Sequence, residues 1–319
     1  MSEDVDVHPV EPRLDLDGSH RLWLSQASAG LEPVYAFASL EYQFQRLARP
    51  SRYRRVVCAI CSDGKRMVGA AVAVGKLGSN SARMSIAATS GGRQPAYEAA
   101  LMAAILEQAN ALRFRVLSVC SHDSKVWQPQ VPRGVDVVNT GDIRILGLEY
   151  EPDIIKAEDV FAGLNVRTER GRYSDAMLPY AVGARQIMAD RPRQHRTRDV
   201  LNESLDFVRA DAEAREEWGE ESLFVVLERE GRLAAFVEFR RPDRARQVWV
   251  VDQIGVVRRL RGTGLGYRTL RLGLDRLESG GHPIRVFASV DAENQVSERL
   301  HRSAGFRISQ TLGRWEVRS

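Results

Sequence analysis

The stretch RRLRGTGLG (258–266) decides how the second half of this sequence folds. It follows QVWVVDQIGVV (247–257), an apolar run that predicts a strand, and it leads into LGYRTLRLGLDRLES (265–279), whose apolar residues recur at helical spacing. A glycine-rich turn between a strand and a helix is a typical phosphate site, because its backbone N–H groups converge and the helix dipole adds positive potential. We therefore expect an anionic group to bind at this turn.

The glycine spacing excludes two common nucleotide-binding motifs. The turn lacks the GK[ST] ending of a P-loop, and its glycines are spaced GxGxG instead of the dinucleotide fingerprint GxGxxG. About 50 residues follow the turn, too few for the further βα units of a dinucleotide-binding domain. The turn therefore predicts neither of these two domains.

Outward from the turn, the second half predicts a mixed string of strands and helices. Pro179 falls inside the first helical pattern and predicts a kink or a later start for that helix. The expected elements are a strand (165–169), two helices (173–189 and 197–218), a hairpin (222–241), a strand (247–257), a helix (265–279), a strand (284–290), a helix (294–304) and a closing hairpin (306–317).

The first half repeats much of this order. Placing the two long helices in register at Tyr97 and Tyr267 gives an offset of 170 residues, which indicates an internal duplication. The expected elements are helices within 21–47, strands over 54–61, 67–75 and 82–90, a helix over 95–112, and strands over 114–121 and 142–151.

A length of 319 residues predicts two domains at roughly 150 residues each. We expect a flexible arm over 1–12, a first domain over 13–155, a linker over 156–164 with a short helix, and a second domain over 165–319.

Two motifs in the second half resemble one family. The pattern Arg261-x-x-Gly264-x-Gly266, at a strand–helix junction, resembles motif A of the GCN5-related N-acetyltransferases, or GNAT superfamily. Downstream, at the family's usual spacing, Asn294-x-x-Ser297-x-x-Leu300-His301-x-x-x-Gly305-Phe306 resembles motif B. The resemblance covers 165–319 well and the first half in outline. It implies an α/β (α+β) fold of two tandem GNAT-like domains, each a mixed, mostly antiparallel sheet flanked by helices.

The resemblance also implies a reaction. Members of this family transfer an acyl group from coenzyme A, most often acetyl-CoA, to a small-molecule amine by direct attack on the thioester, with no metal. It places the following residues at the cofactor: Val256, Arg261, Gly262, Thr263, Gly264, Leu265, Gly266 and Asn294.

The reaction needs a base, because an amine near pKa 10 is mostly protonated at pH 7. The family places its base on the strand before motif A, where Asp252 is the only acidic residue. By the strand period of two, we expect Asp252 to share a face with positions 250, 254 and 256. Glu238 on the preceding strand is a rival base. Asp252 could instead cap a bulge or pair with an arginine, or it could only help to bind the cationic acceptor.

His301 stands where the family commonly has a tyrosine that protonates the departing thiolate. Imidazolium can donate that proton, and a packed or solvated histidine is the alternative. The acidic stretch Glu213, Glu216, Glu217 and Glu220 could attract a cationic amine, but a solvated helix end is the plainer interpretation.

The first half lacks the features that would hold coenzyme A. In the Tyr97–Tyr267 register, Gln94, Pro95 and Ala96 stand in place of Gly264, Leu265 and Gly266, and proline has no N–H to offer a phosphate. We expect this half to keep the fold, to bind no coenzyme A, and to act as a scaffold or as a wall of the acceptor site.

The composition is that of a soluble globular protein, with 44% apolar and 28% charged residues. No apolar run approaches the 18 or so residues that span a bilayer, so no membrane segment is expected. Cys58, Cys61 and Cys120 do not indicate a disulfide framework, so we expect a reducing cytoplasm. Cys58 and Cys61 should point to opposite faces of one strand, which argues against a metal site.

The net charge of +4 does not favour nucleic-acid binding, because it is spread evenly. Residues 1–150 hold 17 basic and 15 acidic residues, or +2, and the rest holds 29 and 27, again +2. With 4 lysines and 42 arginines, the bias is more typical of GC-rich codon usage.

Two other functions stay open at this point. Tandem versions of this fold also include aminoacyl transferases, which usually lack the intact glycine motif. A module that binds coenzyme A without turnover is the third interpretation, and the presence of both motifs argues against it.

Overall fold

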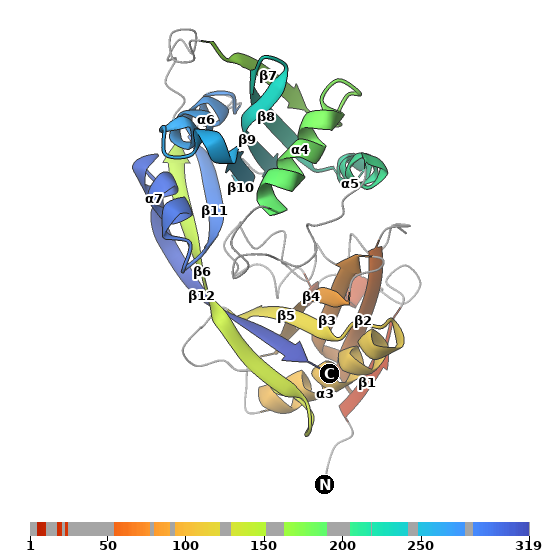
Figure 1. Ribbon diagram of the computed structural model, residues 1–319. Coiled ribbons are helices and arrows are strands. Elements are labelled where there is room, and N and C mark those ends of the chain that lie inside the picture. Colours follow the sequence, from red (N-terminus) through yellow and green to blue (C-terminus); the bar gives the residue numbers. More distant parts are fainter. Residues whose placement is uncertain are drawn as a thin grey trace. The chain divides into compact units, whose positions relative to one another are not determined.

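The computed structural model describes residues 5–10, 18–20, 23–24, 54–76, 80–89, 93–121, 129–150, 163–189, 205–217, 219–241, 248–277 and 283–318 (Figure 1). The chain forms two compact units, Met1–Ile143 with Thr311–Ser319, and Arg144–Gln310. Each unit is built on a mixed, mostly antiparallel sheet that carries helices, as the sequence predicted.

The first unit holds one long described helix, α3, on a sheet with the strand order β1-β2-β3-β4-β5-β12. Strands β1 to β4 are antiparallel neighbours, whereas β4 and β5 are parallel and α3 makes the crossover between them. The C-terminal strand completes this sheet antiparallel to β5. The bounds are β1 (Val5–Pro9), β2 (Arg54–Asp63), β3 (Arg66–Lys76), β4 (Ser81–Ala88), α3 (Gln94–Ala111), β5 (Val116–Ser121) and β12 (Arg307–Arg318).

Small residues on β3 let α3 approach the sheet closely. A Cβ atom at Gly69 would lie 2.8 Å from Leu101 Cδ1 of the helix. Ala71 and Ala73, on the same face of β3, are fully buried in the same core. Burying Leu101 and its apolar neighbours stabilises this contact by about 1.5–3 kcal/mol for each large side chain.

The second unit has the strand order β6-β11-β10-β9-β8-β7. Strands β7 to β10 are antiparallel neighbours, and β10 and β11 are parallel with helix α6 between them in sequence. The bounds are β6 (Asp136–Tyr150), β7 (Asn165–Arg170), α4 (Leu178–Ala189), α5 (Leu205–Glu217), β8 (Glu221–Arg229), β9 (Arg232–Arg241), β10 (Val248–Val256), η5 (Arg258–Leu260), α6 (Leu265–Asp275), β11 (Ile284–Asp291) and α7 (Gln295–Ser303).

The helices of the second unit cover both faces of its sheet (Figure 1). One face packs on α6 and α7 through a core that includes Phe239, Trp249 and Leu270. The other face packs on α4 and α5 through a core that includes Phe224 and Phe236. From Ala235 onward, even-numbered residues of β9 therefore face α4 and α5, and odd-numbered ones face α6.

Strand β10 carries a β-bulge that reverses this alternation. Its register to β9 shifts between Val251, opposite Phe239, and Gln253, opposite Glu238, so that Asp252 is the extra residue. Before the bulge Val251 packs in the α6 core, and after it Ile254 and Val256 pack there instead. Asp252 and Gln253 are therefore consecutive residues that both face α4 and α5.

This bulge corrects the expected face of Asp252. The strict period of two placed it with positions 250, 254 and 256, but residues 254 and 256 lie on the α6 side of the sheet. Asp252 shares its face with Val250, as expected, and also with Gly255, where a Cβ atom would lie 2.9 Å from Ile187 Cγ2 of α4.

Both ends of the described chain differ from the sequence expectation. Residues 5–9 are not a loose arm, because they pair with β2 and cover an edge strand whose backbone groups would otherwise be open. The expected closing hairpin is the single strand β12, since residues 313–318 continue straight and find their hydrogen bonds on β5. The compact units accordingly divide the chain at Arg144 and assign Thr311–Ser319 to the first unit.

The two tyrosines used to align the halves do not occupy equivalent positions. Tyr97 is buried in α3, whereas Tyr267 is exposed on α6. The helices begin at Gln94 and Leu265, which gives an offset of 171 instead of 170. In that register Pro95 corresponds to Gly266.

Some expectations fall outside the described residues, namely most of the helices within 21–47, most of the linker helix, and the start of the helix over 197–218. Within the described residues, no helix has the length and apolar character needed to cross a membrane.

Candidate functional site

The glycine-rich turn lies at the N-terminus of α6 and is exposed. Gly262 and Gly264 adopt φ values of +80° and +78°, in the left-handed region that favours glycine. A Cβ atom at either position would meet no atom of the described chain within 4 Å. These two glycines are thus required by backbone conformation and leave open space beside the backbone.

The start of α6 offers backbone N–H groups to that space. The first residue of the helix to donate back to the turn is Arg268, whose N–H bonds to the Gly264 carbonyl at 3.2 Å. The N–H groups of the first three helical residues, Leu265 to Tyr267, therefore have no carbonyl within the helix to accept them. Thr263 Oγ1 donates to the Leu260 carbonyl at 2.8 Å and Arg261 Nε donates to the Val256 carbonyl at 3.1 Å, so both side chains hold the turn in shape.

Gly266 has a different role from the other two glycines. A Cβ atom there would lie 3.4 Å from Val256 Cγ2 and 3.6 Å from Leu300 Cδ1. Gly266 and the buried Leu265 therefore fix the start of α6 against β10 and α7. The sequence grouped all of these residues as cofactor contacts, and the structure separates an exposed part (Arg261–Gly264) from a packed part (Val256, Leu265, Gly266).

Asn294 caps helix α7. Its Oδ1 accepts the backbone N–H of Ser297 at 3.1 Å, which satisfies one of the donors at the helix start. Its motif B position is therefore explained by local structure in the described chain.

His301 is almost fully buried, and its environment favours the neutral imidazole. Its Nδ1 lies 2.8 Å from the Ser297 carbonyl oxygen, and since a carbonyl only accepts, Nδ1 carries the proton. Its ring packs edge-on against Phe306, and Nε2 is buried with no hydrogen-bond partner among the described residues. Burial lowers the pKa of His301, so the imidazolium needed for an acid is disfavoured. This geometry favours the packing role that the sequence left open.

Asp252 and Arg240 form an ion pair at the bulge. Asp252 Oδ2 lies 2.6 Å from Arg240 Nη2, and the two side chains are 25% and 14% exposed. Two of the alternatives to a base that the sequence left open for Asp252, a bulge position and an arginine partner, are therefore present in the structure.

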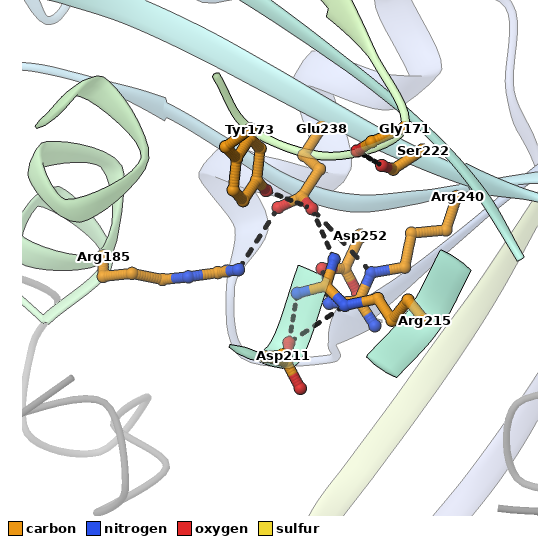
Figure 2. Close-up of polar contacts among 9 residues, drawn as sticks. All are labelled: Gly171, Tyr173, Arg185, Asp211, Arg215, Ser222, Glu238, Arg240 and Asp252. Atoms are coloured by element: carbon orange, nitrogen blue, oxygen red, sulfur yellow. Dashed lines mark hydrogen bonds and ion pairs between the residues drawn. The ribbon is translucent and has the colours of Figure 1, made fainter. Parts of the chain in front are cut away.

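Glu238, the rival base, lies at the centre of a buried cluster (Figure 2). It accepts hydrogen bonds from Tyr173 Oη at 2.7 Å and Arg215 Nη1 at 2.8 Å, and Arg185 Nη2 lies 3.5 Å away. Burial alone would raise the pKa of Glu238, but Arg185, Arg215 and Arg240 together with the tyrosine lower it to about 2. A carboxylate held ionised in this way is a poor proton acceptor.

A second side chain of helix α5 holds Arg215 in this cluster. Arg215 also donates to Asp211, one turn earlier on the helix, with Nε 2.9 Å from Oδ2. Arg185 comes from α4, and Glu238 and Arg240 come from β9, so three elements meet at the cluster (Figure 2).

A protein-family model matches part of the second unit. The model of the acetyltransferase (GNAT) family matches residues 192–306, which include the strand β10, the glycine turn and α7. Residues 192–306 therefore carry a GNAT-family domain. A comparison with curated proteins finds no match.

Solved structures extend the GNAT fold to the whole chain. A tandem GNAT protein from the clavulanic acid biosynthesis pathway aligns with a TM-score of 0.75 at 17% identity, over 98% of each chain. A GCN5-related N-acetyltransferase from Sphaerobacter thermophilus aligns with a TM-score of 0.61 at 12% identity, over 98% of this chain and 95% of that one. A GNAT acetyltransferase from Colwellia psychrerythraea aligns with a TM-score of 0.55 at 11% identity, over 98% and 100%.

The described start of α3 in the first unit differs from the start of α6 in the second. Helix α3 begins after Arg93, which makes no side-chain capping bond, and Pro95 removes one N–H from its first turn. A carboxylate of the chain itself lies nearby: Asp63 Oδ2 accepts from Tyr97 Oη at 3.0 Å and from Arg93 Nη1 at 3.4 Å. Residues 90–92 of the corresponding turn lie outside the described part of the chain.

Sequence reasoning missed Glu220 as a member of this region. It was grouped with a solvated helix end, but it is 2% exposed and precedes β8 directly. Burial raises the pKa of Glu220 to about 8, opposed by Arg240 and reinforced by Asp252 and Glu238. The only sequence signal was its position next to the apolar run SLFVVL (222–227), where a strand begins.

Proposed function

We propose that this GNAT protein is an acyl-CoA-dependent N-acyltransferase that acetylates a small primary amine with acetyl-CoA. The observation that supports this most is the turn before α6, where two glycines with positive φ leave the backbone open beside unbonded N–H groups. Such a turn suits a pyrophosphate, because N–H donors and the helix dipole both favour an anion.

Acetyl-CoA would bring an acyl group already activated as a thioester. The N–H groups over 262–266 would hold its pyrophosphate, and Arg261 adds positive charge beside the turn. Val256, Leu265 and Gly266 would act indirectly by holding the turn and helix in place, and Asn294 by capping α7. The open space at Gly262 and Gly264 fits the close approach of a phosphate group.

In the proposed reaction the amine nitrogen attacks the thioester carbon. A C–N bond forms, the C–S bond breaks, and the proton that the attacking nitrogen then loses passes through water to the departing thiolate. Before attack the acceptor loses a proton from its ammonium group, and we assign Asp252 as the group that holds that ammonium and accepts its proton through water. Its position at the bulge, half-buried and on the α4–α5 face, supports this assignment.

The acid role of His301 rests on the sequence resemblance alone. A neutral imidazole whose Nδ1 proton is engaged by Ser297 has no proton ready for a thiolate. We propose that water protonates the thiolate and that His301 packs α7 against Phe306.

Two measurements test the proposed function. Calorimetry with acetyl-CoA should show micromolar or tighter binding, and free-thiol release with a panel of amines should show turnover that depends on the amine. Binding without turnover for every amine would instead leave a module that senses coenzyme A. No binding of acetyl-CoA would overturn the proposal.

A further inference from the structure

Two buried polar atoms flank the ion pair at the bulge and lack hydrogen bonds in the described part of the chain. One is a donor, Arg240 Nε, and the other is an acceptor, Gln253 Oε1. Arg240 Nε is 3.9 Å from Glu238 Oε1, beyond hydrogen-bond distance. Buried polar groups are nearly always paired, so an unpaired donor and acceptor at neighbouring positions point to a ligand that would satisfy both.

These groups lie on one face of two adjacent strands. Arg240 is opposite Val250 in the register of β9 and β10, and Gln253 is opposite Glu238. The bulge turns Asp252 and Gln253 to the same side as Arg240 (Figure 2 shows Arg240 and Asp252). The Arg240 guanidinium, which donates, and the two side chains that can accept therefore all face α4 and α5.

The charged side chains around the ion pair balance one another. Among the described residues, the guanidinium groups of Arg185, Arg215 and Arg240 stand against the carboxylates of Asp211, Glu238 and Asp252. Tyr173 donates to Glu238 and is neutral, and burial keeps Glu220 largely protonated at neutral pH because it raises its pKa to about 8. A ligand with a bare positive charge would unbalance this buried region, whereas a ligand with both charges would not.

We infer that the acceptor is a zwitterion: a primary amine that also carries a carboxylate, as in an α-amino acid. Its ammonium group would bind Asp252 and Gln253 Oε1. Its carboxylate would bind the Arg240 guanidinium and accept the hydrogen bond that Nε can donate. The ligand would thus replace the Arg240–Asp252 ion pair with two ion pairs of its own. This inference rests on the proposed function for the identity of the site, and it adds the substrate class.

A monocationic amine is the competing acceptor. It could restore the charge balance only if Glu220 released its proton, since Glu220 lies in the field of Asp252, Glu238 and Arg240. The two cases differ in one measurable property, namely whether the carboxylate of the acceptor contributes to binding.

The test compares each amino acid with the amine that remains when its carboxylate is removed. Suitable pairs are glycine and methylamine, leucine and 3-methylbutylamine, phenylalanine and 2-phenylethylamine, and arginine and agmatine. Binding to the full chain is measured by saturation-transfer NMR and calorimetry, with and without coenzyme A, so that the readout does not depend on turnover. We expect at least one amino acid to bind at least tenfold more tightly than its decarboxylated partner.

Two variants locate the groups responsible. Arg240→Met should weaken binding of the amino acid at least tenfold and should change the affinity for the amine less than threefold. Gln253→Met should weaken binding of both members of the pair by similar factors. The matched control is Arg241→Met, because Arg241 has the same 14% side-chain exposure on the same strand but pairs with Glu221 at 3.5 Å over the Trp249 ring, on the opposite face. It should leave both affinities unchanged.

The outcomes separate this inference from the proposed function. Equal binding of both members in every pair, stronger binding of the amines, or no binding of any probe would overturn the zwitterion inference. Transfer of acetyl to the amines without such a preference would leave the proposed function intact. A tenfold preference that Arg240→Met abolishes supports the inference even if no acetyl group is transferred.

Discussion

At the residue scale, two glycines of the same turn are required for different physical reasons. Gly264 is required by its φ of +78° and faces open space, while Gly266 is required by contacts with Val256 and Leu300. A substitution at 264 therefore tests cofactor binding with little effect on internal packing.

Gly264→Val should raise the Kd for acetyl-CoA tenfold or more, equivalent to about 1.4 kcal/mol. The side chain would occupy the space into which a phosphate approaches, and its strained φ costs about 1–2 kcal/mol of stability. Gly231→Val is the matched control, because Gly231 has a φ of +73° and equally open space in the β8–β9 turn. The control should show the same loss of stability by urea unfolding with unchanged affinity. Equal Kd values for the wild-type protein and folded Gly264→Val would remove this turn from the cofactor site.

Asp252→Asn should lower kcat strongly near neutral pH, with partial recovery as pH rises and free amine becomes available. The expectation follows from the proposed role of Asp252 as the group that takes the ammonium proton. The pH–rate profile measures it, with Arg241→Met as a control on the same sheet. A raised acceptor KM with intact kcat would instead show a binding role, and no change in either parameter would make Asp252 structural.

His301 should make folding stability depend on pH. Burial lowers its pKa in the folded state below the unfolded value of about 6.5, so the unfolded chain binds more protons in the pH range between the two values. The stability that His301 confers is therefore complete above about pH 7.5 and falls as pH decreases through 6.5. Urea unfolding of the wild-type protein and His301→Gln at pH 7.5 and 5 should show a stability difference that shrinks at the lower pH.

The same variant distinguishes the packing role from the acid role. A folded His301→Gln protein should keep kcat within a few-fold of the wild type. A loss of roughly 10²-fold or more in kcat, within the range of acid–base groups, would restore the acid role. A stability difference that is independent of pH would contradict the burial of a neutral imidazole.

At the element scale, close packing of α6 on β9 fixes where the turn before the helix lies. A Cβ atom at Gly273 would clash with the Phe239 ring and would lie 2.6 Å from Val237 Cγ1. The bulge in β10 acts at the same scale, because one extra residue moves Asp252 and Gln253 to the α4–α5 face.

Gly273→Ala should destabilise the protein by about 1–3 kcal/mol through overpacking, although alanine favours a helix over glycine. Gly183→Ala is the control on helix α4, where the added Cβ would lie 3.2 Å from the flexible end of Leu233. The control should be neutral or should stabilise by up to about 1 kcal/mol. Urea unfolding measures both variants, and equal effects would show that α6 can move away from the sheet at little cost.

At the scale of the whole molecule, two units of one fold have diverged at the same helix start. The second unit has the open glycine turn, whereas the first has Pro95 in the helix and Asp63 beside it. A carboxylate of the chain itself repels an incoming pyrophosphate and competes for the same donors.

We therefore expect one acetyl-CoA per chain in calorimetry. The Gly264→Val variant should lose that single binding event without revealing a second, weaker one of similar enthalpy. Two equivalents bound to the wild-type chain would contradict the assignment of the first unit as a scaffold.

The sequence by itself determined most of the order of strands and helices and the position of the glycine turn. Both depend on local physics: apolar periodicity marks each element, and a positive φ at Gly262 and Gly264 requires glycine whatever the surroundings. Motifs A and B were recognisable for the same reason, since their residues are close in the chain.

Only the tertiary structure decided which side chains share the site. The bulge at Asp252 comes from pairing with β9, and a strict period of two could not reveal it. The burial of Glu220 and His301 depends on how the elements pack, so their pKa values could not be inferred from the sequence. The C-terminal strand joined the first unit because β5 offered it a free edge, and that edge exists only once the sheet has formed.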